Sequence, residues 1–334
     1  MGVSLREILT DYKKPASPAD LAKTCAVDGN NALYQFVTTI RQPDGTPLMD
    51  NHGRITSHLS GLFFRVTNFL ESGMRPIFIF DGKPPEMKQV TIEARRERRD
   101  EAAASYKEAI AAGDLEAASK YARSASRLDA ETFSSSQKLL TLMGIPWFVA
   151  PSEGEAQAAV MAQKGDVAFS ISQDYDSLLF GTPRLVRNMT VSRKRKVHGR
   201  TISVNPEIIT LSELLSGLKI TRENLIEMGI LIGTDFNDGI KGIGPKKALK
   251  IVRDGAFDKT VKENCPNLDC EEIMKFFLNP PYSSDYRLNW KDPDTEGILS
   301  YLCEDYEFSR TRIEAILEKL NKGKGQKTLD QWFG

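Results

Sequence analysis

The hydrophobic positions of this chain fall into short apolar runs that alternate with longer stretches of helical pattern. Four of these runs have the residue types of β-strands and cover residues 24–27, 77–80, 146–149 and 167–171. Short apolar runs separated by helix-like segments are typical of α/β proteins with a mainly parallel sheet. We therefore predict an α/β fold built around one such sheet.

Acidic residues follow each of the four runs. In open α/β sheets the ligand site lies outside the carboxyl ends of the strands, so these acids should meet in one crevice. The six carboxylates concerned are Asp28, Asp81, Glu153, Glu155, Asp174 and Asp176. Crowded carboxylates raise one another's pKa unless cations neutralise them. Because oxygen-only ligands favour Mg²⁺ or Mn²⁺ over zinc, the pattern predicts a site for such divalent ions.

Each acid also has a simpler structural interpretation. The segment 152–155 fits a capping box, in which Ser152 caps a helix running to about Lys164 and Glu155 reaches back to it. An Asp after a strand is often only a turn residue. These interpretations explain the acids one at a time, but they do not explain why acids follow all four strands.

The composition is that of a globular protein, with 40% hydrophobic and 27% charged residues among 334. No apolar run approaches the ~20 residues of a membrane helix, and the N-terminus is charged from Arg6 onward, so we expect neither a membrane span nor a signal peptide. The four cysteines form no C-x-x-C pair, and the three histidines have no zinc spacing. We therefore expect reduced thiols, an intracellular chain and no zinc.

Residues 82–130 differ in kind from the sheet-forming segments. After the Pro84-Pro85 break they are polar, Ala-rich and highly charged, with good helix propensity but little continuous apolar face. They predict helices that project into solvent, either as a surface helix with i,i+4 ion pairs or as a cationic cover over the acids. This insertion leaves the sheet directly after Asp81. Five cations could therefore lie over the crevice and meet an anionic substrate: Lys88, Arg95, Arg96, Arg98 and Arg99.

A second basic region combines a helical pattern over 224–235 with a Gly-rich turn and a helix that opens at Pro245. Glycines let a backbone approach closely, and the free N–H groups at the start of a helix bind phosphate. The residues that would grip a nucleic-acid backbone without reading its bases are Gly242, Gly244, Lys246 and Lys247. The alternative is a plain helical hairpin with a solvated basic face.

The C-terminus has linker composition over 322–325 and then spaces four side chains like one helical turn. These are Gln326, Leu329, Trp332 and Phe333. They either fold back on the core or anchor the chain in a hydrophobic pocket of another protein.

Six segments in this order resemble the flap endonucleases of the structure-specific 5′ nuclease superfamily, and the resemblance covers nearly the whole chain. The segments are VDGNNALYQF, FIFDGKPPEMK, PSEGEAQAA, SQDYDSLLF, GTDFNDGIKGIGPKKA and QKTLDQWF. The resemblance implies a PIN-like three-layer fold with a helical arch over 82–130 and a helix-two-turn-helix element at about 222–254. It also implies one nuclease domain over 1–324, made of an N-terminal region (1–100) and an internal region (131–258), followed by a tail over 325–334. The tail lacks the long basic extension of eukaryotic members, so the chain is more similar to the archaeal branch.

The resemblance also assigns roles to individual residues. It adds Asp235 to the six carboxylates, and it implies that these seven side chains together hold two Mg²⁺ ions. Mn²⁺ can substitute for Mg²⁺. Lys88 and Arg95 correspond to cations that approach the scissile phosphate, and Tyr34 to an aromatic on which a base stacks. Gly2 corresponds to a residue that packs near the active site. The four tail residues correspond to the box that binds the sliding clamp of replication, PCNA.

We therefore expect two-metal hydrolysis of a phosphodiester at the junction of a 5′ flap, with 5′→3′ exonuclease activity, in lagging-strand synthesis and repair. We expect a monomer with no membrane association, in the cytoplasm of an archaeal-type cell or in the nucleus if the source is eukaryotic. One alternative is a 5′→3′ exonuclease of the same superfamily, or a PIN-type ribonuclease. The other is a non-enzymatic adaptor that binds DNA and the clamp, in which the acids only cap helices and turns.

Overall fold

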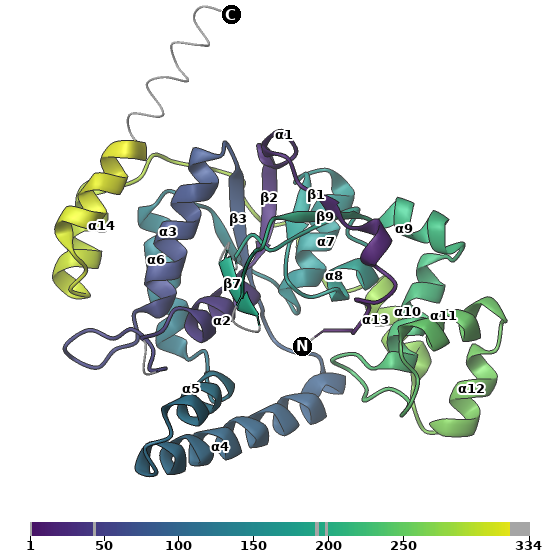
Figure 1. The fold of residues 1–334 in the computed structure, drawn as a ribbon. Helices are drawn as coiled ribbons and strands as arrows, with labels where there is room; N and C mark the ends of the chain where they lie inside the picture. Colours follow the sequence, from purple (N-terminus) through teal and green to yellow (C-terminus); the bar gives the residue numbers. More distant parts are fainter. Residues whose placement is uncertain (1, 43–44, 191–193, 198–199, 321–334) are drawn as a thin grey trace, which may run out of the picture.

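The computed structural model describes residues 2–42, 45–190, 194–197 and 200–320, and a seven-stranded sheet lies at its centre (Figure 1). The strand order is β1-β9-β6-β5-β2-β3-β4. Five neighbouring strands run parallel: β2 (Thr24–Asp28), β3 (Arg75–Phe80), β4 (Trp147–Val149), β5 (Phe169–Ile171) and β6 (Arg184–Arg187). β9 (Glu207–Thr210) is antiparallel to β6, and β1 (Lys14–Pro15) is antiparallel to β9. The four predicted strands and the mainly parallel sheet are confirmed.

Helices cover both faces of the sheet. Successive side chains of a strand point to opposite faces, so the apolar residues of a buried strand contact helices on both sides. In β3, Phe78 and Phe80 pack into a core with α2 (Gly29–Thr39), α3 (Ser57–Glu71) and α6 (Ala130–Leu142). The alternate residues Ile77 and Ile79 pack instead against α7 (Gly154–Lys164). The three-layer α/β fold is thereby confirmed, with a hydrophobic core on each face.

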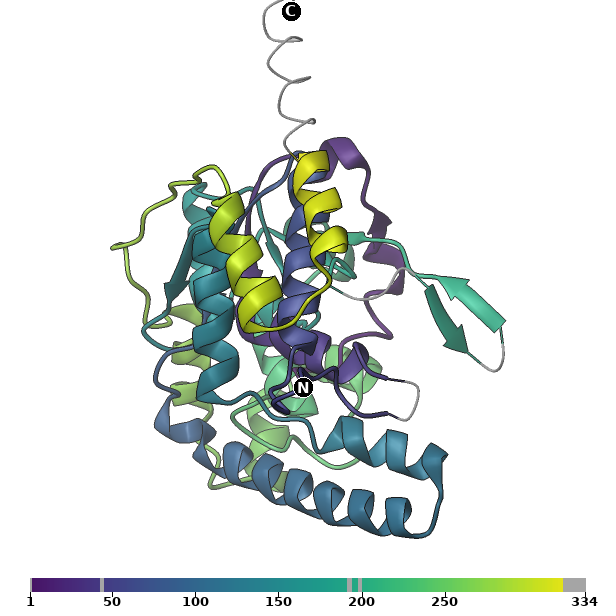
Figure 2. The ribbon, with the colours of Figure 1, turned by 90° about the vertical axis from the view of Figure 1, so that its left-hand side faces the viewer.

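The other elements lie around these layers. They are η1 (Thr10–Tyr12), α1 (Pro18–Leu21), α8 (Asp176–Leu179), α9 (Leu211–Leu218), α12 (Phe257–Asn264), α13 (Cys270–Leu278), α14 (Thr295–Leu299), the π-helical segment η3 (Ser300–Asp305) and a helix over 310–320. The strands β7 (Lys194–Val197) and β8 (Arg200–Ser203) pair as a separate hairpin that stands out from the body (Figure 2). Within the described residues, no helix is both long and apolar enough to cross a membrane.

The predicted helical insertion forms an arch that consists of η2 (Glu86–Lys88), α4 (Gln89–Ala111) and α5 (Leu115–Ser124). The two α-helices pack against each other and lie outside the three layers, next to the carboxyl ends of the strands (Figures 1 and 2). Only Ala102 and Ala109 of α4 are buried, which fits its lack of a continuous apolar face. The expectation of helices that project into solvent is confirmed.

The second predicted helical element consists of α10 (Arg222–Ile232) and α11 (Pro245–Arg253), which pack against each other. Gly244 is the N-cap of α11 and Pro245 is its first residue, as the sequence predicts. Gly242 in the connecting loop has a φ of 82°, a left-handed conformation that glycine adopts without strain.

Candidate active site

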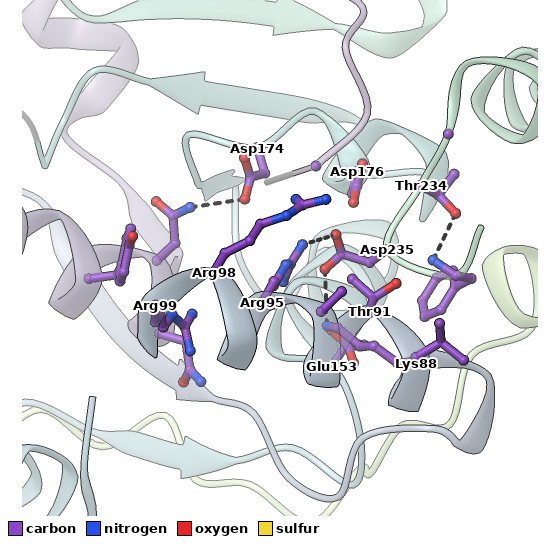
Figure 3. Close-up of a pocket in the computed structure, with 18 of the residues that line it drawn as sticks. Lys88, Thr91, Arg95, Arg98, Arg99, Glu153, Asp174, Asp176, Thr234 and Asp235 are labelled. Atoms are coloured by element: carbon purple, nitrogen blue, oxygen red, sulfur yellow. Dashed lines mark hydrogen bonds and ion pairs between the residues drawn. The ribbon is translucent and has the colours of Figure 1, made fainter. Parts of the chain in front are cut away.

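The predicted crevice exists as a cavity of about 1090 Å³, lined by residues at the carboxyl ends of the strands and by residues of the arch. Each of the seven predicted carboxylates lines it: Asp28, Asp81, Glu153, Glu155, Asp174, Asp176 and Asp235. Lys88, Arg95, Arg98 and Arg99 line the same cavity from the arch, and Figure 3 shows Arg95 and Arg98 pointing toward the carboxylates. Arg96, which the sequence also suggested as a cover for the acids, does not line the cavity and is exposed.

Two carboxylates are placed by neighbouring strands. Asp28 ends β2 and also caps α2, because its Oδ1 accepts a hydrogen bond of 2.9 Å from the backbone N–H of Asn31. Asp81 follows β3, and its own N–H donates to the side-chain oxygen of Asn30 at 3.0 Å. Since β2 and β3 pair in parallel, the two acids emerge side by side at the same edge. Asp28 thus has a structural role as the cap of α2, but this role does not explain why its carboxylate also lines the cavity.

Glu153 and Glu155 come from the start of α7, and the structure contradicts the alternative interpretation of residues 152–155 as a capping box. The N-cap is Glu153 rather than Ser152, and the buried hydroxyl of Ser152 has no hydrogen-bond partner. The backbone N–H of Gly154 instead donates to Asp81 Oδ1 at 2.7 Å. A carboxylate from β3 thus satisfies a free N–H at the start of the helix, which leaves Glu153 and Glu155 directed into the cavity.

Asp174 lies in the turn between β5 and α8, and Asp176 is the first residue of α8. Asn31 donates its side-chain N–H to Asp174 Oδ2 at 3.2 Å, and the backbone N–H of Val3 donates to Asp176 Oδ1 at 2.6 Å. The N-terminal segment therefore reaches the site, as the prediction for Gly2 requires. A Cβ on Gly2 would lie 2.8 Å from Asp176 Cγ, so only glycine fits there without displacing the carboxylate.

Asp235 lies in the loop after α10 and meets the base of the arch (Figure 3). Lys88 Nζ lies 3.3 Å from its Oδ2, and Arg95 donates a hydrogen bond to its Oδ1. Lys88 also donates to Glu153. The two cations thus pair with two of the seven carboxylates that line the cavity.

Burial is the main cause of the unusual protonation equilibria in the site. It raises the pKa of Asp28 and of Asp81 to about 6, with the neighbouring charges of Asp174 and Asp28 adding to the respective shifts. Burial and the charges of Asp235 and Asp174 raise the pKa of Asp176 to about 7. The pKa of Glu155 lies well above its ordinary value for the same two reasons. These carboxyls would ionise more readily if a cation were bound among them.

At the base of the arch, Lys88 and Arg95 oppose the effect of burial on the pKa values of the neighbouring carboxyls. Burial would raise the pKa of Asp235, but Lys88 and Arg95 outweigh it and hold that pKa below its ordinary value. Burial opposes the charge of Lys88, yet Glu153 and Asp235 raise the pKa of the ammonium, so Lys88 stays charged. The same ammonium limits, but does not cancel, the rise that burial causes in the pKa of Glu153.

The donor set fits hard divalent cations. The carboxylates present only oxygen, and burial raises the pKa of Asp28, Asp81, Glu155 and Asp176, an effect that a bound Mg²⁺ or Mn²⁺ would oppose. No group of three His, Cys, Asp or Glu side chains among the described residues is already arranged to hold an ion. Metal binding would therefore involve reorientation of carboxylates, and those that pair with Lys88 and Arg95 are the ones that would exchange partners.

The predicted DNA-binding residues divide into two places. Tyr34, on α2, and Gly2 line the cavity. Gly242, Gly244, Lys246 and Lys247 do not line it, and all four are exposed at the start of α11 and the loop before it. The predicted clamp-binding residues Gln326, Leu329, Trp332 and Phe333 lie outside the described residues.

Two residues that hold carboxylates in place were not predicted from the sequence. Asn31 bonds to both Asp28 and Asp174, and the hydroxyl of Ser172 donates to Asp28 Oδ2 at 3.1 Å and also contacts Glu155. The sequence did contain one indication of them, namely their proximity to predicted ligands. Asn31 lies three positions after Asp28, and Ser172 lies two positions before Asp174.

The sequence matches the XPG N-terminal domain over residues 1–102 and the XPG I-region over residues 144–235. It is 59% identical to Flap endonuclease 1 of Methanosphaerula palustris, over the full length of both chains. It is 54% identical to Flap endonuclease 1 of Pyrococcus abyssi, covering 100% of this chain and 98% of that one. The chain belongs to the flap endonuclease family. The resemblance inferred from its motifs, including the archaeal affinity, is confirmed.

The fold leads to the same family. The solved structure of flap endonuclease-1 from Methanococcus jannaschii aligns with a TM-score of 0.76 and 42% identity, covering 96% of this chain and 99% of that one. Flap endonucleases are nucleases, which are hydrolases that act on DNA, and the family in general depends on divalent metal ions. The PIN-like arrangement expected from the sequence is therefore correct as well.

Proposed function

We propose that this flap endonuclease cleaves branched DNA by hydrolysing one phosphodiester at the junction between a 5′ flap and its duplex, with 5′→3′ exonuclease activity on the same site. One observation carries this proposal: seven carboxylates converge at the strand ends under the cationic base of the arch. Such a site suits a substrate whose reacting group is an anionic phosphate and whose reaction needs divalent cations. Removal of displaced primer strands in lagging-strand synthesis and repair is the corresponding role.

We propose two Mg²⁺ ions, replaceable by Mn²⁺, as the cofactors. Asp28, Asp81, Glu153 and Glu155 would mainly hold one ion, and Asp174, Asp176 and Asp235 the other. Bound there, the pair would supply an activated water and stabilise charge on the attacking and leaving oxygens. The carboxylates then act as ligands and need no role as general bases.

Lys88 and Arg95 are the proposed catalytic cations. Both lie at the base of the arch, and their pairing with Asp235 already directs them to the site of the carboxylates. Fixed positive charge where the transition state gains negative charge lowers the barrier, and it costs no reorganisation during the reaction. Lys88 suits this role because its carboxylate neighbours keep it charged.

DNA would contact two separate surfaces. Gly242, Gly244, Lys246 and Lys247 at the start of α11 are proposed to bind duplex phosphates, with exposed lysines and free helix N–H groups. Tyr34 is proposed to stack on a base beside the scissile bond, since it lines the cavity next to the carboxylates. Specificity would follow from the shape of the junction, because these contacts involve the backbone and one stacked base.

The decisive experiment compares a 5′-labelled flap DNA with its blunt duplex, in Mg²⁺ and in chelator, for the native chain and for Asp176→Asn. Asparagine keeps an oxygen for the N–H of Val3 but loses the charge, so the fold should survive. We expect incision at the junction in Mg²⁺ only and its loss in the variant. DNA affinity should stay similar or increase, because a negative charge near phosphate is removed. Equal cleavage of both substrates would favour the exonuclease alternative, and binding without incision in every lane would favour the adaptor.

We propose one nuclease domain over residues 1–324, with regions 1–100, 82–130 and 131–258, and a tail over 325–334 that binds PCNA through Gln326, Leu329, Trp332 and Phe333. The chain would act as a monomer, without membrane association, in the cytoplasm and on the chromosome. Deletion of 326–334 should remove stimulation by the clamp and leave intrinsic cleavage intact. Loss of both would make the tail part of the core.

A further inference from the structure

Arg187, the last residue of β6, contacts both neighbours of Asp174 from outside the cavity. Its Nε and Nη2 donate to the backbone carbonyl of Gln173 at 3.1 and 2.9 Å. Its Nη1 donates to the phenol oxygen of Tyr175, and its guanidinium lies 3.9 Å from the centroid of that ring. One planar group therefore holds residues 173 and 175, which flank Asp174 in the sequence and precede Asp176.

The backbone of Gln173 is fixed from both sides. Its N–H donates to the side-chain oxygen of Asn31 at 3.3 Å, and its carbonyl accepts from Arg187. Asn31 also donates to the carboxylate of Asp174 at 3.2 Å. The turn that carries Asp174 is thus held between α2 on the cavity side and β6 on the other.

Arg187 is itself held firmly in place. In the register of β6 and β9 it lies opposite Glu207, whose Oε1 is 2.8 Å from its Nη1, and only 15% of its side chain is exposed. Lys13 approaches the same carboxylate at 3.5 Å and the ring of Tyr175 at 5.4 Å. A guanidinium with this support can fix an adjacent turn, because its orientation is itself determined by packing and ion pairing.

We propose that Arg187 is a positioning residue for the metal site, which sets the turn 173–175 so that Asp174 and Asp176 present their carboxylates to a divalent ion. Arg187 is not among the residues that line the cavity, so it would act on a bound ion through the turn and not by direct contact. The inference rests on the proposed function, because it takes Asp174 and Asp176 to be ligands. Removal of a residue that orients metal ligands without binding the metal itself commonly weakens metal affinity 10- to 100-fold.

The test measures Mn²⁺ binding to the full chain without DNA by electron paramagnetic resonance, and the Mg²⁺ dependence of single-turnover flap cleavage. For Arg187→Met we expect the half-saturating metal concentration to rise at least about tenfold in both assays. The cleavage rate at saturating Mg²⁺ should return close to that of the native chain, and DNA affinity in chelator should not change. A general loss of packing would lower the saturated rate or the melting temperature and would not produce this split.

Arg187→Lys separates geometry from charge. A lysine keeps the charge but has one ammonium, which cannot serve the carbonyl, the phenol and the carboxylate in one plane, so metal binding should stay weak. Arg184→Met is the matched control, because Arg184 begins the same strand and takes no part in these contacts with 173–175. If Arg187→Met fails to fold, Tyr175→Phe removes only the phenol oxygen that Arg187 contacts, and it should produce a smaller shift in the same direction.

Several outcomes overturn the inference. Native Mn²⁺ affinity in Arg187→Met, full recovery in Arg187→Lys, or an equal shift in Arg184→Met would each mean that Arg187 does not position the ligands. These results differ from failure of the proposed function. In that case the native chain itself would bind no Mn²⁺ or would not cleave, whatever residue stands at position 187.

Discussion

The guanidinium of Arg95 on α4 donates a hydrogen bond to the carboxylate of Asp235, which lies 140 residues further along the chain in the loop after α10. Lys88 approaches the same carboxylate at 3.3 Å. The base of the arch is therefore tied to the loop that connects α10 and α11 within the helix-two-turn-helix element. A cation in this position can serve both as a partner of a buried acid and as a contact for the phosphate.

Arg95→Ala should lower single-turnover flap cleavage by at least about 100-fold, because one preorganised charge is lost from the transition state. Metal binding should stay unchanged or become tighter, since Asp235 loses a competing cation. Rapid-quench kinetics with excess enzyme measure the first effect, and Mn²⁺ titration measures the second. Arg96→Ala is the control, because Arg96 is the next residue and does not line the cavity. An equal loss in both variants would mean that only the overall charge of the arch matters.

Gly2→Ala should impair cleavage without unfolding the chain. The added Cβ would lie 2.8 Å from Asp176 Oδ1 and 3.0 Å from Asp174 Cβ, so both carboxylates must move. We expect the cleavage rate to fall roughly 10- to 100-fold, as for other disturbances beside a metal ligand. The melting temperature and the affinity for DNA in chelator should change little. Thr10→Ala, at an exposed position of the same N-terminal segment that does not line the cavity, should cleave normally. A native rate in Gly2→Ala would show that the N-terminus moves away from Asp176 during the reaction.

Gly244→Ala tests whether DNA approaches the start of α11. No atom lies within 4 Å of the Cβ that this change would add, and the φ of Gly244 is −99°, so alanine fits the folded chain. Loss of one phosphate contact should weaken flap binding about tenfold, or ~1.4 kcal/mol. Fluorescence anisotropy measures the affinity, and thermal unfolding serves as the control for the fold. Gly242 cannot serve this purpose, since its φ of 82° makes alanine strained whether or not DNA binds. Unchanged affinity in Gly244→Ala would remove this loop from the DNA interface.

The ends of the strands and the acids that follow them were predictable, because each is marked by residues that are neighbours in the sequence. The alternation of apolar runs with helical segments places β2, β3, β4 and β5, and parallel pairing then brings their carboxyl ends together. Asp235 follows a helix rather than a strand, so only the family resemblance indicated it. Patterns of chain periodicity do not show which loop faces a distant sheet edge.

The errors had long-range or geometric causes. The alternative interpretation of residues 152–155 as a capping box does not hold, because the backbone N–H of Gly154 donates to Asp81, 73 residues earlier, and local capping rules do not include such a partner. Arg96 is exposed and does not line the cavity, and its position on α4 is rotated by about 100° from that of Arg95. Ala94 is rotated equally far in the other direction and does line the cavity. The helical period alone therefore does not tell which residues of α4 face the cavity. The contacts of Arg187 could not be predicted from the sequence either, because they depend on the pairing of β6 with β5 and β9.

The last prediction concerns the pH dependence of stability in the absence of metal. Burial and neighbouring charge raise the pKa of Asp176 from an ordinary 3.8 to about 7 in the folded chain. The folded state then binds this proton more tightly than the unfolded state does. The contribution of Asp176 to stability is therefore fully present below the unfolded pKa and is lost as the pH rises through about 7.

Asp176→Asn removes the ionisation and keeps an oxygen for the N–H of Val3. In chelator, its melting temperature relative to the native chain should therefore increase between about pH 5 and about pH 8. Scanning calorimetry over that range measures the difference, and saturating Mg²⁺ on the native chain provides the second arm. Bound cations should offset the repulsion among the carboxylates and reduce the fall in native stability at high pH. A constant difference between variant and native chain at every pH would mean that Asp176 is already ionised in the folded chain, with its charge satisfied by the N–H of Val3 and other groups of the protein.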